Sequence, residues 1–132
     1  MQIKFLRSGG FAGAATNVAG TVEFTAHGAQ VSGKATGYHR DLSAQEVEKL
    51  LAAAVPSDLE KVKQAASSTG PIRDGYQFEI TVAVKGGPPL SLTLGQGLAD
   101  QMKAVSPAAA YLGAWIEEEA DKIWNHRVNS IP

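Results

Sequence analysis

The stretch Arg-Ser-Gly-Gly-Phe-Ala-Gly, residues 7–13, is the first segment whose composition suggests chemistry. Glycine-rich loops present successive backbone N–H groups and can therefore bind phosphate. A P-loop, however, ends in Gly-Lys-Ser/Thr, and a dinucleotide fingerprint opens the helix of a βαβ unit. Here Gly13 precedes Ala-Ala-Thr-Asn and then a segment with the alternation of a strand. The sequence therefore predicts a loop between two strands and not a phosphate site.

Nucleophilic and metal chemistry have equally weak support. The chain has no cysteine, so thiol catalysis and thiolate metal sites are absent. The three histidines, His27, His39 and His126, show no i, i+2 or i, i+4 spacing of the kind that forms a ready metal site. Ser8 lacks the Gly-x-Ser-x-Gly frame of a nucleophile elbow. We therefore expect no enzyme activity, no metal and no cofactor.

Residues 39–42 read His-Arg-Asp-Leu, the letters that open a protein-kinase catalytic loop. That loop also needs an asparagine five positions after the aspartate, where this chain has Glu46. The chain is also far shorter than a kinase domain. The motif is interpreted as a polar approach to a helix, with Asp41 near the positive helix N-terminus.

The spacing of apolar residues predicts the strands and helices that would position any functional site. Alternation of apolar and polar residues predicts strands, most strongly where Phe78, Ile80 and Val82 share one face. Residues 29–38 are small and polar, so this segment is either a weak edge strand or a long loop. The strands are expected at residues 2–6, 21–26, 76–84 and 90–94, with the first two forming a hairpin around residues 7–13.

Helices are indicated by capping residues followed by a period near 3.6. Ser43 with Glu46, and Ser57 with Glu60, have the spacing of a capping box. Ser106 with Pro107 is a favourable start for a long final helix, and residues 117–119 are expected on its outer side. The helices are expected at residues 43–54, 58–66 and 98–105 and from residue 106 onward.

Together these elements predict an α+β fold, with an antiparallel sheet of about four strands and helices packed on one face. At 132 residues the chain is expected to form a single domain over 1–125, followed by a C-terminal tail over 126–132. Apolar residues make up 44% and the net charge is −1, so no global field attracts nucleic acid or anionic lipid. No signal peptide or membrane-spanning run is evident, and we expect a cytoplasmic protein.

A short strand, then the loop 7–13, then a helix opened by Leu-Ser-x-x-Glu, then an Asp-Gly-Tyr-x-Phe strand resembles emfourin. The matching pieces are residues 7–13, 42–51 and 74–84, the turn at Gly86-Gly87, and the last helix with Leu112, Trp115 and Ile116. Emfourin-like proteins are small bacterial inhibitors of thermolysin-like zinc metallopeptidases. The resemblance covers most of the chain in order, but only the loop 7–13 is specific. Residues 14–41 are longer and less charged than in that family, as if a strand or hairpin had been added.

The resemblance implies an inhibitor of such a peptidase. Nothing in the sequence suggests that it supplies a zinc ligand, so occlusion of the peptidase cleft by the loop is the simpler hypothesis. Thermolysin-like enzymes prefer a bulky apolar residue just after the scissile bond, which the Gly10-Phe11 pair would suit. Phe11 has two interpretations: it enters the peptidase pocket, or it folds back onto the protein's own core. The expected partner-binding residues are Arg7, Ser8, Gly9, Gly10 and Phe11, with Asn17 and Val18 as the next candidates.

The expected partner is thus a thermolysin-like metallopeptidase, with no nucleic acid and no membrane, and with the chain as a monomer or weak homodimer. The alternative is a non-catalytic protein–protein interaction module, a homodimer or adaptor that uses the polar face of the sheet. A third and weaker alternative is an enzyme whose site is assembled from the scattered histidines.

Overall fold

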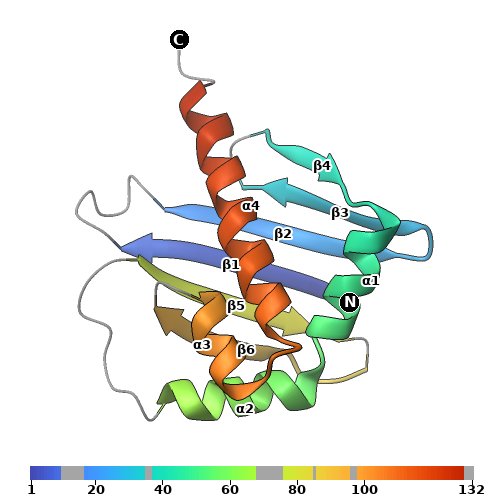
Figure 1. Ribbon diagram of the computed structural model, residues 1–132. Coiled ribbons are helices and arrows are strands. Elements are labelled where there is room, and N and C mark those ends of the chain that lie inside the picture. Colours follow the sequence, from blue (N-terminus) through green and yellow to red (C-terminus); the bar gives the residue numbers. More distant parts are fainter. Residues whose placement is uncertain (10–16, 35–36, 68–75, 85, 96–97, 130–132) are drawn as a thin grey trace.

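The computed structural model describes residues 1–9, 17–34, 37–67, 76–84, 86–95 and 98–129 (Figure 1). Within them the chain forms six strands and four helices, so the expected α+β class is confirmed. The strands are β1 (Gln2–Gly9), β2 (Val18–Thr25), β3 (Gly28–Gly33), β4 (His39–Asp41), β5 (Tyr76–Ala83) and β6 (Leu90–Gly95). The helices are α1 (Ala44–Ala53), α2 (Pro56–Ser67), α3 (Leu98–Val105) and α4 (Ala110–Asn129).

All described strands belong to one antiparallel sheet with the order β4-β3-β2-β1-β5-β6. The expected hairpin of the first two strands is present, with Ile3 opposite Val22 and Arg7 opposite Val18. On its other side β1 pairs with β5 along its whole length, from Gln2↔Ala83 to Gly9↔Tyr76. The N-terminal strand is therefore central in the sheet, bonded on both edges.

The sheet has six strands and not about four, because residues 28–41 add two strands at one edge. In β3 the two apolar side chains, Ala29 and Val31, are buried, while the polar residues between them face outward. This alternation holds β3 against β2 although its residues are small. The segment 39–41, whose letters resemble a kinase loop, is β4, a short edge strand.

The helices pack on one face of the sheet, with α4 crossing it diagonally (Figure 1). Every second residue of the long strands is buried beneath them, as with Ile3 and Phe5 in β1. The ring of Phe5 lies against Gly20 of β2, where an added Cβ would come within 2.3 Å of the ring. The Phe5 ring also packs edge-on against the ring of Trp115 in α4, with the two ring centroids 6.3 Å apart. Gly20 thus lets an aromatic ring fill the centre of the core.

The helix boundaries match the sequence in part. The capping box of Ser43 and Glu46 is present at α1, with each side chain bonded to the other residue's backbone N–H. Ser57, by contrast, lies inside α2, because the helix already begins at Pro56, whose fixed φ suits a first helical position. The last helix begins at Ala110, after a turn that follows Pro107, and continues through Asn129 into the segment expected as a tail.

None of the helices in the described part of the chain is long and apolar enough to cross a membrane.

Candidate functional site

The site indicated by the sequence adjoins the end of the β1–β2 hairpin, where the described residues stop at Gly9 and resume at Asn17. Pairing with β2 continues to Arg7↔Val18, and pairing with β5 continues to Gly9↔Tyr76. The strand that leads into residues 10–16 is therefore held on both edges up to its last residue. Gly10 and Phe11 lie outside the described residues, so neither interpretation of Phe11 is tested.

Two of the expected partner-binding residues are buried. The Arg7 side chain is only 8% exposed, and its Nη1 bonds Asp121 Oδ1 of α4 at 2.7 Å. Val18, opposite Arg7, belongs to the hydrophobic core. Both side chains thus point toward the helices, and the bond of Arg7 to Asp121 attaches the end of the hairpin to α4.

The other candidates are closer to solvent. Ser8 and Asn17 are partly exposed, and Ser8 follows Arg7 on the strand and so points to the opposite face. The backbone of Gly9 pairs with β5. The hairpin end therefore has an inner side that anchors it and an outer side near which the segment 10–16 begins.

A second polar site, which the sequence analysis missed, lies at the β4 edge of the sheet. Here a partly buried network, called the Arg40 cluster, joins β4 to α1 and α4. The Arg40 guanidinium makes two bonds of 2.9 Å to Glu46 and bonds of 2.8 and 3.2 Å to Glu119. Its members are Tyr38, Arg40, Glu46, Trp115 and Glu119.

The carboxylates of the Arg40 cluster have further donors. Tyr38 donates its hydroxyl to Glu119 Oε1 at 2.6 Å, and Trp115 Nε1 donates to Glu46 Oε2 at 2.9 Å. Glu119 is only 1% exposed, so burying its charge depends on these bonds. The cluster satisfies its charges internally and connects three elements. Its arrangement fits a role in holding the fold.

The ionisation of the Arg40 cluster follows from these contacts. Hydrogen bonds from Arg40 lower the pKa of Glu46 to about 2, against the opposing effect of burial. Burial, followed by the bond to Glu119, raises the pKa of Tyr38 to about 12. Glu46 is thus charged and Tyr38 neutral throughout the physiological range, so neither is poised to exchange protons in catalysis near neutral pH.

Glu119 was expected on the outer side of the last helix, and this prediction was wrong. Counting from Leu112 and Ile116 in steps of three and four residues reaches Glu119 and then Ile123. All four are fully or almost fully buried. The signal available in the sequence was a single glutamate on an apolar stripe of the helix. A glutamate buried at such a position needs a cation as its partner.

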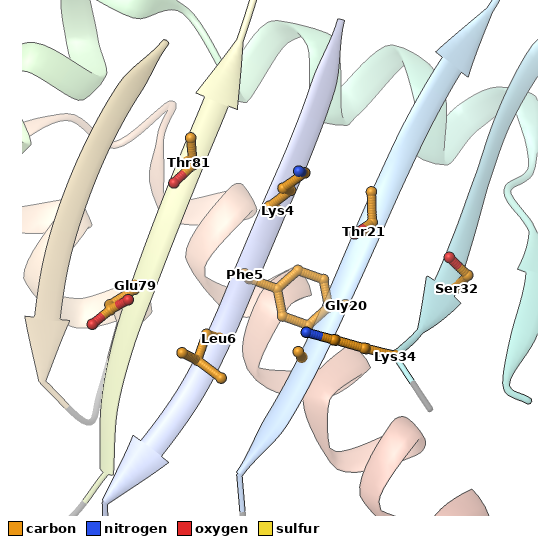
Figure 2. Close-up of a pocket in the computed structure, with 10 residues that line it drawn as sticks. Lys4, Phe5, Leu6, Gly20, Thr21, Ser32, Lys34, Glu79 and Thr81 are labelled. Carbon is orange, nitrogen blue, oxygen red and sulfur yellow. The ribbon is translucent and has the colours of Figure 1, made fainter. Parts of the chain in front are cut away.

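A third feature is a hollow of about 590 Å³ on the face of the sheet opposite the helices (Figure 2). Lys4 stands at its centre between Thr81 and Thr21, and Lys34 reaches back over β2. Glu79 lies on its far side from Lys34, on β5. Such a lining can hydrogen-bond polar or charged groups but offers no nucleophile activated by a neighbouring base.

Metal ligands do not gather in the described residues, where no group of three or more His, Asp or Glu side chains is suited to hold an ion. His39 bonds Gln30 at 3.0 Å, and the His126 ring meets Tyr38 edge-on at 5.6 Å. His27 lies in the turn between β2 and β3.

Comparisons with known proteins gave no match, whether to a protein-family model, to a curated protein or to a solved structure.

Proposed function

We propose that this protein inhibits a thermolysin-like zinc metallopeptidase by placing the glycine-rich residues that follow β1, with Phe11 among them, in the active-site cleft; Arg7, Ser8 and Gly9, expected as part of a loop, belong to the strand itself. The observation that carries the proposal is the double pairing of β1, which is bonded to β2 through Arg7 and to β5 through Gly9. A loop that leaves a central strand has a fixed base. Binding then costs less ordering entropy than it would for a loop on a mobile edge.

Arg7 contributes to the proposal as a positioning residue. Its buried bond to Asp121 ties the base of the loop to α4, a helix of 20 residues that packs across the sheet. A rigid base matters for an inhibitor because a loop that can adjust inside a protease cleft is more readily cut. The peptidase would then contact the outer residues of the loop, with Phe11 as the apolar anchor.

The experiment is a titration of a thermolysin-like peptidase with the purified chain, followed through cleavage of a small substrate. Phe11→Ala is compared with Leu51→Ala, which removes an exposed apolar side chain from α1. We expect inhibition by the wild-type chain, at least a tenfold weaker inhibition by Phe11→Ala, and no change with Leu51→Ala. A lack of inhibition across several such peptidases would refute the proposal. Equal inhibition by a folded Phe11→Ala would refute only the role of Phe11.

The second candidate function is a non-catalytic interaction module, an adaptor that binds through the open face of the sheet. The specific observation in its favour is the polar hollow around Lys4 and Lys34 (Figure 2), which no helix of the described chain covers. Lys4→Glu separates the two candidates, because it changes the centre of the hollow and leaves the hairpin end intact. Under the inhibitor proposal this variant inhibits like the wild type, whereas an adaptor would lose its partner.

A further inference from the structure

An apolar surface lies at the end of the sheet opposite the segment 10–16. It is formed by the β5–β6 turn and the start of α2. A hollow of about 580 Å³ opens here, lined by Val84, Pro88 and Leu90 among others and by one stripe of α2. A second hollow of about 400 Å³, lined by Met1 and Phe24, also includes Val84. Val84 therefore lies between two adjoining hollows, and we call their combined lining the Val84 surface.

The apolar side chains of this surface are unusually accessible. Among the described residues, the large hydrophobic side chains classed as exposed are Leu51 at 47%, Val84 at 39% and Val55 at 37%. Val84 is at the centre of the Val84 surface, and Val55 directly precedes Pro56, which lines it. Of these three residues only Val84 lines the two hollows, whose lining is otherwise contributed by less exposed apolar residues and prolines. An apolar hollow with an exposed side chain at its centre is typical of interaction sites on soluble proteins.

The backbone around the surface is preorganised for binding. Pro88 and Pro89 restrict the turn after Gly86, which has a φ of +84° that a glycine adopts without strain. Val82 forms a buried floor beneath the exposed rim. Docking onto such a surface needs little ordering of the chain, which favours association.

The charges at the rim indicate which partner fits. The α2 residues that line the hollow are Pro56, Glu60 and Lys63, spaced as one stripe of a helix. If two α2 helices pack antiparallel about a two-fold axis between Glu60 and Lys63, each glutamate meets the lysine of the other helix. The rim is thus complementary to itself, as an isologous interface requires.

We infer that the Val84 surface binds a second copy of this chain, forming a two-fold dimer in which the α2 stripes pack antiparallel and the Val84 side chains are buried. The dimer leaves both hairpin ends exposed, because β1 runs from the Val84 surface at Gln2 to the opposite end of the sheet at Gly9. The inference is therefore independent of the proposed inhibition, and either can fail without the other.

The test is sedimentation equilibrium of the full chain over a range of concentrations. We expect the average mass to rise toward twice the 13.8 kDa of one chain. Val84→Lys should weaken the dimer at least tenfold, because it buries a charge at the centre. The control is Thr93→Lys, which puts the same charge on an exposed position of β6 on the open side of the sheet. This variant should leave the dimer affinity unchanged. A mass that stays at one chain at every concentration overturns the inference.

The charge arrangement has its own test, with variants at exposed positions that leave the core intact. Glu60→Lys and Lys63→Glu should each weaken the dimer severalfold, since each brings like charges together across the axis. The double variant Glu60→Lys/Lys63→Glu should restore the wild-type association. Failure of the double variant to recover, with both single variants weakened, overturns the two-fold arrangement proposed here.

Discussion

Two arginines bond carboxylates of α4, and their surroundings differ sharply. Arg40 is held by four bonds to two carboxylates, one of which, Glu119, is 1% exposed. Arg7 is itself buried, but its carboxylate partner Asp121 is 69% exposed. The buried Glu119 carboxylate depends on Arg40 to compensate its charge, whereas the exposed Asp121 carboxylate is already solvated by water.

The difference separates a contact that maintains the fold from one that positions a segment. Loss of the Arg40 side chain removes both guanidinium bonds from the buried Glu119 and leaves it only the more distant Lys122 Nζ at 3.9 Å as a cation, which is strongly destabilising. Loss of the Asp121 charge removes an attraction that water screens on the side of the acid, and it leaves the buried Arg7 guanidinium without this carboxylate. The hairpin end is thus attached to α4 by a bond between a buried cation and a solvated acid, while the β4 edge depends on an ionic cluster whose acid Glu119 is buried.

The largest expected effect is that of Arg40→Ala. We expect a loss of about 3 kcal/mol in the free energy of unfolding, because Glu119 then remains buried without a guanidinium. Urea unfolding followed by circular dichroism measures this loss. Lys61→Ala, which removes a cation from an exposed position of α2, serves as the matched control and should change stability by less than about 0.5 kcal/mol. A similar small change for Arg40→Ala would remove the distinction between the two arginine sites.

The second largest effect is expected from acid, which should lower the stability that the Arg40 cluster contributes. The pKa of Glu46 is about 2 in the folded chain against an ordinary 4.5, so its contribution is present above 4.5 and is lost as the pH falls toward 2. The loss exceeds about 1 kcal/mol, since one pKa unit corresponds to about 1.4 kcal/mol. Stability measured across this range should fall less steeply for Glu46→Gln. An identical slope for both proteins would contradict the assignment.

A smaller effect is expected from Trp115→Phe. The ring that meets Phe5 is largely kept, but the bond from the indole N–H to Glu46 is lost. A hydrogen bond to a charged group contributes about 1.5 kcal/mol, and we expect a loss of that size in unfolding experiments. In an Arg40→Ala background the same substitution should cost a different amount, because both residues bond Glu46. Additive losses would show that the cluster does not act as a unit.

The smallest effect on stability is expected from Asp121→Asn. It should lower the free energy of unfolding by about 1 kcal/mol, because the lost charge is exposed and the asparagine Oδ1 can still accept the bond from the buried Arg7. Under the proposed function it should nevertheless weaken inhibition severalfold, since Arg7 then positions the loop less firmly. The control is Glu118→Gln, which removes an exposed charge from the same helix. Unchanged inhibition by Asp121→Asn would argue against positioning by Arg7.

The sequence predicted the fold where one side chain pattern dominates. The alternation of Phe78, Ile80 and Val82 identified β5, and Ser43 with Glu46 identified the start of α1, because these signals are local. Residues 29–38 were left open between a weak strand and a loop, since the place of Ala29 and Val31 in the sheet depends on pairing with β2. The strand propensity of a segment does not show whether a partner strand lies beside it.

The candidate sites show the same limit. The loop 7–13 was found from its composition, but the burial of Arg7 depends on a residue 114 positions away. The Arg40 cluster joins residues from β4, α1 and α4, and no short motif connects them. Glu119 was the detectable part, a charge on the stripe that also contains Ile116 and Ile123.

The position of β1 in the centre of the sheet has a consequence for biosynthesis. Its first partner, β2, emerges from the ribosome soon after it, but its second partner, β5, follows only after α1 and α2. Until Ala83 is available to pair with Gln2, one edge of β1 has no strand beside it. Long-range pairing of this kind slows folding and exposes an aggregation-prone edge. In a nascent chain that stalls before β5, one edge of β1 thus stays unpaired. Release of such a fragment would favour strand addition between chains.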